Sequence, residues 1–141
     1  EAHLPAYKPE APKLLKIIVF NYLFSNGDAH FKNFSLIETP MGDFRLSPAY
    51  DLLNSRIHIA DNDFALDGGL LPGHLSQGKI LHQFAVLAEQ ASIQEKFFND
   101  LMSLMVSKSV LVKKMVAASF LNETTKRNYW QSYQGRLKHI Q

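Results

Sequence analysis

The sequence contains no cysteine, so neither a disulfide framework nor a thiolate metal site is available to it. It also lacks a long apolar run. The longest, from Leu14 to Phe24, is far shorter than the roughly 20 residues that a membrane-spanning helix needs. Nothing near the N-terminus resembles a signal peptide. We therefore expect a cytoplasmic protein with no membrane association.

Neither sign of charge dominates. The chain has 15 Lys and Arg against 13 Asp and Glu, and the two signs are mixed along the sequence. Such a balance does not produce the basic face on which nucleic-acid binding depends. Basic residues accompany Tyr129, Trp130 and Tyr133 near the C-terminus, but these aromatics share one helical face with Leu137 and Ile140. We expect them to be core residues, and no nucleic-acid contact as a main function.

The length of 141 residues predicts a single domain or one lobe of a larger protein. Three prolines within residues 1–12 predict an extended lead-in, and the apolar run predicts a buried helix over Lys13–Phe24. Asn26 and Gly27 end this helix, and Gly27 suits the left-handed position that often follows a helix.

Two short apolar segments, separated by a turn that contains Pro and Gly, predict a β-hairpin. The strands are residues 34–37 and 44–46, and we expect Ile37 to face Arg45. Because side chains alternate between the faces of a strand, this register also decides which residues meet at the open end of the hairpin.

The pattern becomes helical from about residue 76, which predicts a helical bundle over residues 76–140. Ser92 and Glu95 have the spacing of a capping box, and Asn122 is placed to cap the last helix. Residues 61–67 fit an acidic turn better than a Ca²⁺ loop, because the Gly and the closing Glu are missing. The chain is predicted to be mainly α with a short β-hairpin.

Polar residues are dense in the loop between the buried helix and the hairpin. Asp28, His30, Lys32 and Asn33 lie within six positions, and Asp51 follows the hairpin. The register brings Asn33 and Asp51 to the open end of the hairpin, beside the loop that carries Asp28. Phosphoryl transfer from ATP needs a carboxylate for the substrate proton, oxygen ligands for Mg²⁺ and groups that offset phosphate charge. In protein kinases a base Asp and a Mg²⁺-binding Asn are five residues apart, and a second Mg²⁺-binding Asp follows a hairpin. The spacing here predicts such a site.

Each of these residues also has a structural alternative. Asp28, taken alone, is typical of a turn, and Asp51 is placed to cap a helix at Leu52. His30 and Lys32 are equally compatible with an ordinary loop. Only the combined spacing favours catalysis.

Two segments, Asp28–Leu36 and Arg45–Leu53, closely resemble the C-terminal lobe of HipA-like toxin kinases. These are bacterial serine/threonine protein kinases of toxin–antitoxin systems, associated with persistence. The family pattern N-x-D-x-H-x-K-N-x-S matches Asn26 through Ser35, and its Pro-x-Tyr-Asp motif matches Pro48 through Asp51. The resemblance therefore implies the C-terminal lobe of a protein-kinase-like fold.

Carried onto this sequence, the resemblance implies that Asp28 is the catalytic base and that Asn33 and Asp51 are the Mg²⁺ ligands. His30 and Lys32 would lie near the ATP phosphates. The family also implies transfer of the γ-phosphate of ATP to a protein hydroxyl. A HipB-like helix-turn-helix antitoxin is the implied partner, and aminoacyl-tRNA synthetases are the known class of substrate.

Parts of such an enzyme are missing from the sequence. Ahead of residue 13 there is no Gly-rich loop, no Walker A sequence and no Val-Ala-Ile-Lys-like strand. The chain also begins with Glu1 and not with Met. We expect residues 1–141 to be a single C-terminal lobe without its N-terminal lobe, with little ATP turnover alone. Its catalytic loop and hairpin are residues 26–53, ahead of the helical bundle.

Two other functions fit the sequence less well. One is a non-catalytic lobe that docks a DNA-binding antitoxin, which a start codon close before Glu1 would favour. The other is a small-molecule phosphotransferase, since those enzymes share the spacing from Asp28 to Asn33. The Pro48–Asp51 motif, in place of an Ile-Asp-Phe-type ending, favours the toxin-kinase family.

Overall fold

The structure is a computed structural model that describes residues 7–55, 71–72, 74–75 and 78–141. The expected acidic turn at 61–67 lies outside the described residues. Within them, the fold is mainly α-helical with one antiparallel two-stranded hairpin, as the sequence predicted. None of the helices in these ranges has the length and hydropathy needed to cross a bilayer.

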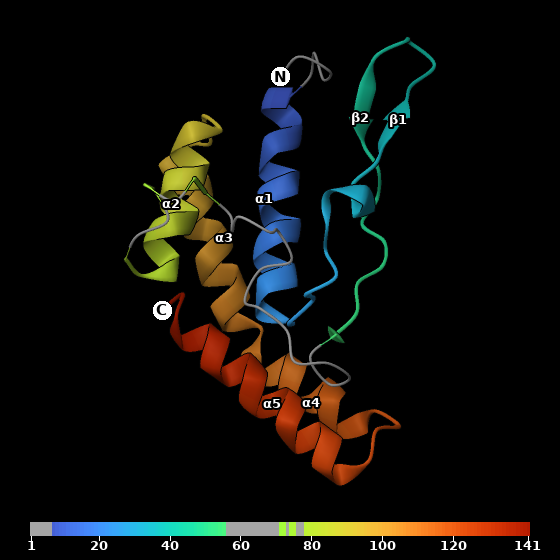
Figure 1. Cartoon of the computed structure of the whole chain (residues 1–141), viewed down its shortest axis with the longest axis vertical. Coiled ribbons are helices and arrows are strands. Elements are labelled where there is room, and N and C mark those ends of the chain that lie inside the picture. Colours follow the sequence, from blue (N-terminus) through green and yellow to red (C-terminus); the bar gives the residue numbers. More distant parts are fainter. Residues whose placement is uncertain (1–6, 56–70, 73, 76–77) are drawn as a thin grey trace.

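The elements follow one another as five α-helices, one 3₁₀ helix and two strands in the described ranges. In chain order they are α1 (Tyr7–Leu23), η1 (Phe31–Asn33), β1 (Leu36–Glu38), β2 (Phe44–Leu46), α2 (Ile80–Gln90), α3 (Glu95–Ser107), α4 (Ser109–Ala118) and α5 (Glu123–Lys138). Figure 1 shows α1 in the middle, with the hairpin on one side and α2 and α3 on the other. Helices α4 and α5 lie across its C-terminal end.

Helix α1 is central because its side chains face several neighbours at once. It contacts β2, α2, α3 and α5. Val19 is completely buried, and Leu15 and Tyr22 are almost so. Burying such side chains stabilises the fold by about 1.5–3 kcal/mol each. The predicted buried helix is therefore confirmed.

The start of α1 differs from the prediction. The helix begins at Tyr7, so the expected extended lead-in is wrong for the described residues from Tyr7 onward. Pro9 is tolerated because it lies in the first turn, where backbone N–H groups have no intrahelical acceptor. Pro12 lies further in and removes one helical hydrogen bond. Tertiary contacts also hold this part of α1, and a proline count cannot reveal them.

One of these contacts is made by Glu10, which is buried although it is charged. Its Oε2 accepts a hydrogen bond from the backbone N–H of Leu46 (2.9 Å), and its Oε1 accepts one from Lys13 Nζ. The hydrogen bond from Lys13 lowers the pKa of Glu10 below its ordinary value, against the opposing effect of burial. Glu10 thereby joins the first turns of α1 to strand β2.

The end of α1 is formed by Ser25 and not by Gly27. Ser25 has a φ of 55°, and its N–H donates to Tyr22 O (3.1 Å). The N–H of Asn26 donates to Asn21 O (2.9 Å). These two bonds are those of a Schellman motif, whose left-handed residue directly follows the helix. The expected left-handed Gly27 was wrong because the helix ends two residues earlier than that position requires.

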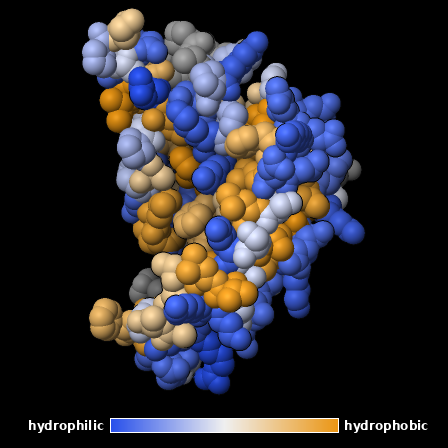
Figure 2. Space-filling view, turned by 180° about the vertical axis from the view of Figure 1, so that it is seen from behind, coloured by the Kyte–Doolittle hydropathy of each residue, from blue (hydrophilic) through white to orange (hydrophobic). Residues whose placement is uncertain are grey.

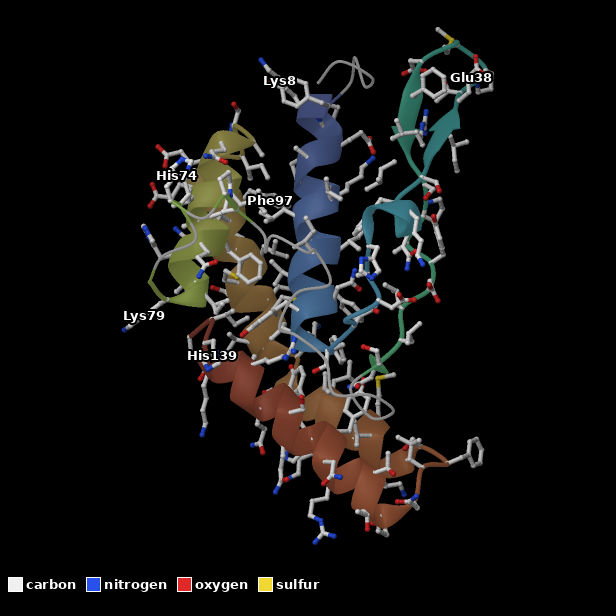
Figure 3. All side chains as sticks on the ribbon, in the orientation of Figure 1. Lys8, Glu38, His74, Lys79, Phe97 and His139 are labelled. Atoms are coloured by element: carbon white, nitrogen blue, oxygen red, sulfur yellow. The ribbon has the colours of Figure 1, made fainter. Side chains whose placement is uncertain are left out.

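The hairpin has the predicted register. Ile37 pairs with Arg45, and Gly42 in the turn has a φ of 80° that suits glycine. Strand β1 begins at Leu36, two residues later than expected. The hairpin tip, marked by Glu38 in Figure 3, points away from the helical bundle. The open end therefore faces the loop that follows α1.

The C-terminal half is a helical bundle, as predicted. Its buried side chains form one cluster with those of α1. The members from the C-terminal half are Phe84, Ala88, Phe98, Leu101, Met102, Met105, Val112, Tyr133, Leu137 and Ile140. Tyr133 is thus a core residue, as predicted, and Trp130 is partly buried and packs against the cluster. Tyr129 is half-buried and does not belong to it.

The two predicted helix caps have different outcomes. Asn122 caps α5, with its Oδ1 accepting from the N–H of Thr125 (2.9 Å). Ser92 does not cap α3, whose N-cap is Gln94. Instead Ser92 has a φ of 55°, and its N–H and that of Ile93 donate to the last turn of α2. Ser92 therefore ends α2, and the capping-box prediction was wrong.

We expect Asn122→Ala to lower the free energy of unfolding by about 0.5–2 kcal/mol, because the first turn of α5 loses its side-chain acceptor. Urea denaturation measures this change. Asn128→Ala is the matched control, since Asn128 is exposed inside the same helix. Equal losses in the two variants would contradict a capping role for Asn122.

Helix α5 holds the C-terminal end of α1. Arg136 is buried, and its Nη1 donates to Tyr22 O (2.6 Å) while the guanidinium lies 4.9 Å from the centre of the Tyr22 ring. The Tyr22 hydroxyl is hydrogen-bonded to His139 Nδ1 (2.7 Å). Ser25 Oγ is hydrogen-bonded to Ser132 Oγ (3.0 Å). The end of α1, where the loop with the predicted site begins, is thus held in place by these contacts.

Candidate functional site

The loop after α1 is compact. The N–H of His30 donates to Asp28 O (2.8 Å), and the N–H of Asn33 donates to His30 O (2.9 Å). The second of these bonds closes the short helix η1. As a result, Asn33 turns back toward Asp28 before the chain enters β1.

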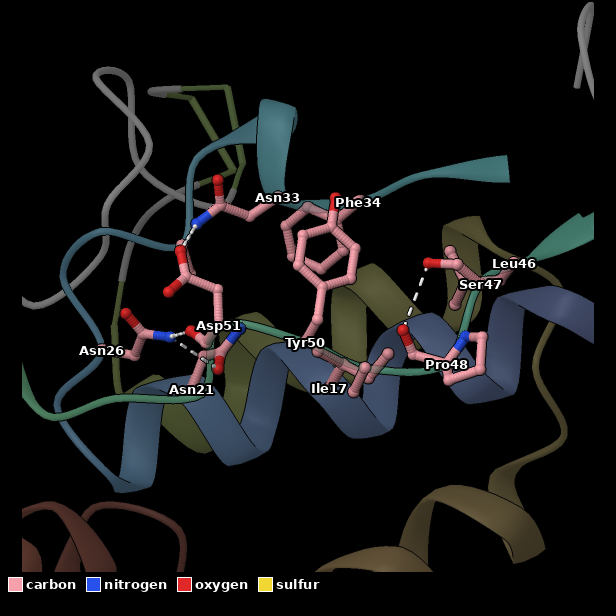
Figure 4. A pocket seen from close by; sticks show the side chains of 12 residues that line it. Ile17, Asn21, Asn26, Asn33, Phe34, Leu46, Ser47, Pro48, Tyr50 and Asp51 are labelled. Atoms are coloured by element: carbon pink, nitrogen blue, oxygen red, sulfur yellow. Dashed lines mark hydrogen bonds between the residues drawn. The ribbon is translucent and has the colours of Figure 1, made fainter. Parts of the chain in front are cut away.

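Asn33 and Asp51 are brought together, as the hairpin register predicted. Asn33 Nδ2 donates to Asp51 Oδ2 (2.9 Å) and to the backbone oxygen of Asp28 (2.8 Å). Figure 4 shows the Asn33 amide and the Asp51 carboxylate facing each other. One amide therefore links the two loops that carry the two aspartates. The chemical roles of the three residues remain predictions.

Asp51 has an unusual backbone, with a φ of 55°. Aspartate visits this left-handed region more readily than most residues. No α-helix starts at Leu52 in the described residues, so the alternative of a helix N-cap is wrong. The carboxylate is exposed and open to a ligand.

His30 and Asp28 lie next to each other at the surface. His30 Nε2 is 3.7 Å from Asp28 Oδ1, and both side chains are about half exposed. The side chain of Lys32 is also exposed, and its backbone oxygen accepts from the Tyr50 hydroxyl (3.2 Å). Asp28, His30 and Lys32 are therefore all on one solvent-facing loop.

Tyr50 strengthens the connection between the two loops. Its hydroxyl is hydrogen-bonded to Ser35 Oγ (2.7 Å) as well as to the Lys32 backbone. Ser55 adds a further link on the other side of Asp51, because its Oγ accepts from the N–H of Gly27 (2.8 Å) and donates to Ser25 O (3.1 Å). The segment around Asp51 is thus fixed at both ends.

Asn26 was predicted to end the helix, but its contact with Asp51 was not predicted. It is 6% exposed, and its Nδ2 donates to the backbone oxygen of Asp51 (2.9 Å) and to Asn21 Oδ1 (3.2 Å). Figure 4 shows these two bonds beneath the Asp51 carboxylate. The available signal was Asn21, a polar residue near the end of the apolar run Leu14–Phe24.

Two hollows in the described part of the chain differ in chemistry. Asn21, Asn26, Asn33 and Asp51 line a pocket of about 10 Å³, which has room for one water and none for a nucleotide. A cavity of about 480 Å³ lies between α1, α3, α4 and α5, and Lys108 is the single charged residue among those that line it. Figure 2 shows how far apolar side chains extend over the rear face of the molecule. Of these two hollows, the one beside Asp51 is the one lined by a cluster of polar side chains.

The donor set at this neighbourhood fits Mg²⁺. Within the described ranges no three His, Cys, Asp or Glu side chains converge, and His74 and His139 lie on the far side of α1 from the hairpin (Figure 3). Mg²⁺ is usually held by one or two carboxylates, substrate phosphates and waters, so it needs no such cluster. Because Asn33 Nδ2 already serves two acceptors, the amide oxygen is the atom left for a cation. That oxygen and the Asp51 carboxylate are suitable hard ligands.

Comparison with known proteins gives two findings. The family described as HipA-like C-terminal domain matches residues 2–118. A protein of Sinorhizobium fredii named "Putative kinase Y4dM" is 34% identical over 94 residues, which are 64% of this chain and 22% of that protein. The chain thus spans less than a quarter of the relative's length. The predicted resemblance is confirmed, and the chain belongs to the HipA-like C-terminal domain family.

Proposed function

We propose that this chain is the C-terminal lobe of a HipA-like serine/threonine protein kinase, which transfers the γ-phosphate of ATP to a protein hydroxyl. The observation that carries the proposal is the bond between Asn33 and Asp51 beside the backbone of Asp28. It joins two loops whose residue spacing is that of protein kinases. Family membership and the name of the Sinorhizobium relative support it.

Asp28 is the general base in this proposal. Its half-exposed carboxylate is reachable by a substrate hydroxyl and accepts the proton as the phosphoryl group is transferred. His30, 3.7 Å away, and the exposed Lys32 contribute positive or hydrogen-bonding groups near the phosphates.

Asn33 and Asp51 hold the metal in this proposal, through the amide oxygen and the carboxylate. When bound, Mg²⁺ neutralises charge on the ATP phosphates. The described pocket is too small for a nucleotide. ATP would therefore lie over the open side of these residues, with its adenine and inner phosphates held by a second lobe.

The biological setting proposed is a bacterial toxin–antitoxin system in the cytoplasm. A HipB-like helix-turn-helix antitoxin would bind the protein, and its substrate would be a protein, with aminoacyl-tRNA synthetases as the candidate class. A non-catalytic lobe that docks the antitoxin is the alternative. It would bind the antitoxin equally well after the acidic and amide groups of the site had been replaced.

We expect the complete gene product to incorporate ³²P from γ-labelled ATP into protein only when Mg²⁺ is present. The 141-residue chain alone should incorporate little or none, because it supplies one side of the nucleotide site. Scintillation counting of precipitated protein, with EDTA as the control, measures both. Rapid incorporation by the isolated chain would contradict the half-site interpretation. No incorporation by the complete protein, with antitoxin binding intact, would favour the docking alternative.

A further inference from the structure

Asn26 joins the end of α1 to the backbone of Asp51. Its side chain is almost fully buried, and Nδ2 donates both to Asp51 O (2.9 Å) and to Asn21 Oδ1 (3.2 Å). Asn21 is also buried, in the last turn of α1. A buried amide thus connects the central helix α1 to the loop that carries a proposed metal ligand.

The orientation of the Asn26 amide is fixed by its partners. Both neighbours of Nδ2 are oxygen acceptors, so a flipped amide would place oxygen against oxygen twice. Among the described residues, Asn26 Oδ1 is buried without a hydrogen-bond partner. An unpaired buried acceptor costs about 1–3 kcal/mol. The small pocket that Asn26 lines has room for one water, which can supply a donor to this oxygen.

Asp51 needs such support because of its backbone conformation. Its φ of 55° is in the left-handed region, which costs a non-glycine residue free energy unless neighbouring groups hold it there. The bond from Asn26 holds the carbonyl of Asp51, and the bond from Asn33 holds its carboxylate. Together they determine where the carboxylate oxygens point.

We infer that Asn26, oriented by Asn21, is a positioning residue that sets the direction of the Asp51 carboxylate toward a bound divalent cation. This inference rests on the proposed function, since Asp51 is a metal ligand only in that proposal. Partners that orient a ligand typically contribute about 10–100-fold to metal affinity or activity. Asn26 itself touches neither metal nor substrate.

The test uses the complete protein with ADP and Mn²⁺, whose free concentration is read by electron paramagnetic resonance. We expect Asn26→Ala to raise the Kd for Mn²⁺ by about 10–100-fold. Kinase assays should show a similar rise in the Mg²⁺ concentration needed for half-maximal rate, with kcat at saturating Mg²⁺ changed much less. Asn21→Ala should have a smaller effect, because Asn26 keeps its bond to Asp51.

A conservative variant and a stability control accompany these variants. Asn26→Ser retains one hydroxyl donor, so its Mn²⁺ affinity should lie between those of Asn26→Ala and the wild type. If Asn26→Ala does not fold, Asn26→Ser takes its place in the test. Asn122→Ala destabilises the fold at a distance and should leave the Kd for Mn²⁺ unchanged. Thermal melts show whether each variant is folded.

Unchanged Mn²⁺ affinity in folded Asn26→Ala or Asn26→Ser would overturn the inference, and so would an equal loss in Asn122→Ala. A wild-type protein without measurable Mn²⁺ affinity would overturn it as well. These results are distinct from failure of the proposed function. If the wild type transfers no phosphate but Asn26→Ala still weakens Mn²⁺ binding, the positioning role stands and the kinase proposal falls.

Discussion

Asp28→Asn is expected to reduce phosphoryl transfer by the complete protein by about 10²–10⁴-fold, the usual contribution of a general base. The amide has nearly the shape of the carboxylate but cannot accept the substrate proton. The side chain is about half exposed, so the fold should be unaffected. Initial rates of ³²P transfer, with circular dichroism for the fold, measure the two effects separately.

Asp100→Asn is the matched control for this substitution. Asp100 is exposed on α3, and the change removes the same charge without touching the loop after α1. We expect it to be as active as the wild type. A folded Asp28→Asn variant with normal activity would show that Asp28 is not the base.

Asp51→Asn is expected to weaken binding of Mg²⁺ and its nucleotide by more than the roughly 10–100-fold typical of residues that only orient a ligand. The substitution removes the negative charge that the cation requires. Asparagine tolerates a left-handed backbone about as well as aspartate, so the φ of 55° can be kept. Isothermal titration with Mg²⁺ and ADP measures the change.

The two aspartate variants should respond differently to added metal. Raising Mg²⁺ should restore much of the rate of Asp51→Asn, because its defect is one of occupancy. It should not restore Asp28→Asn, whose metal ligands are intact. Recovery of both variants, or of neither, would contradict the separate roles assigned to the two residues.

The sequence was sufficient for features that depend on local patterns. The apolar run around Val19 predicted the buried helix, and two short apolar segments around a turn with Pro and Gly predicted the hairpin, with Ile37 facing Arg45. That register also predicted that Asn33 and Asp51 lie together at the open end of the hairpin, where the structure joins them by a bond of 2.9 Å.

The sequence was insufficient where contacts distant in the chain decide the outcome. Pro12 is accepted inside α1 in part because Glu10 holds that turn against β2, 36 positions away at Leu46. Ser92 is followed three residues later by Glu95, as in a capping box, yet it ends the preceding helix. In the same way, Asn26 is an ordinary turn residue by type, and only the fold shows its bond to Asp51.

The attachment of α5 to Tyr22 and Ser25 bears on where this domain can be considered to end. The family match stops at residue 118, whereas Ser132 and Arg136, which hold the start of the loop with the proposed catalytic residues, come later. A truncation after residue 118 would keep every proposed catalytic group. It would remove the hydrogen bonds from Ser132 and Arg136 that hold the end of α1, from which the loop starts. The contacts that hold the end of α1 therefore extend beyond the matched residues, through the last helix.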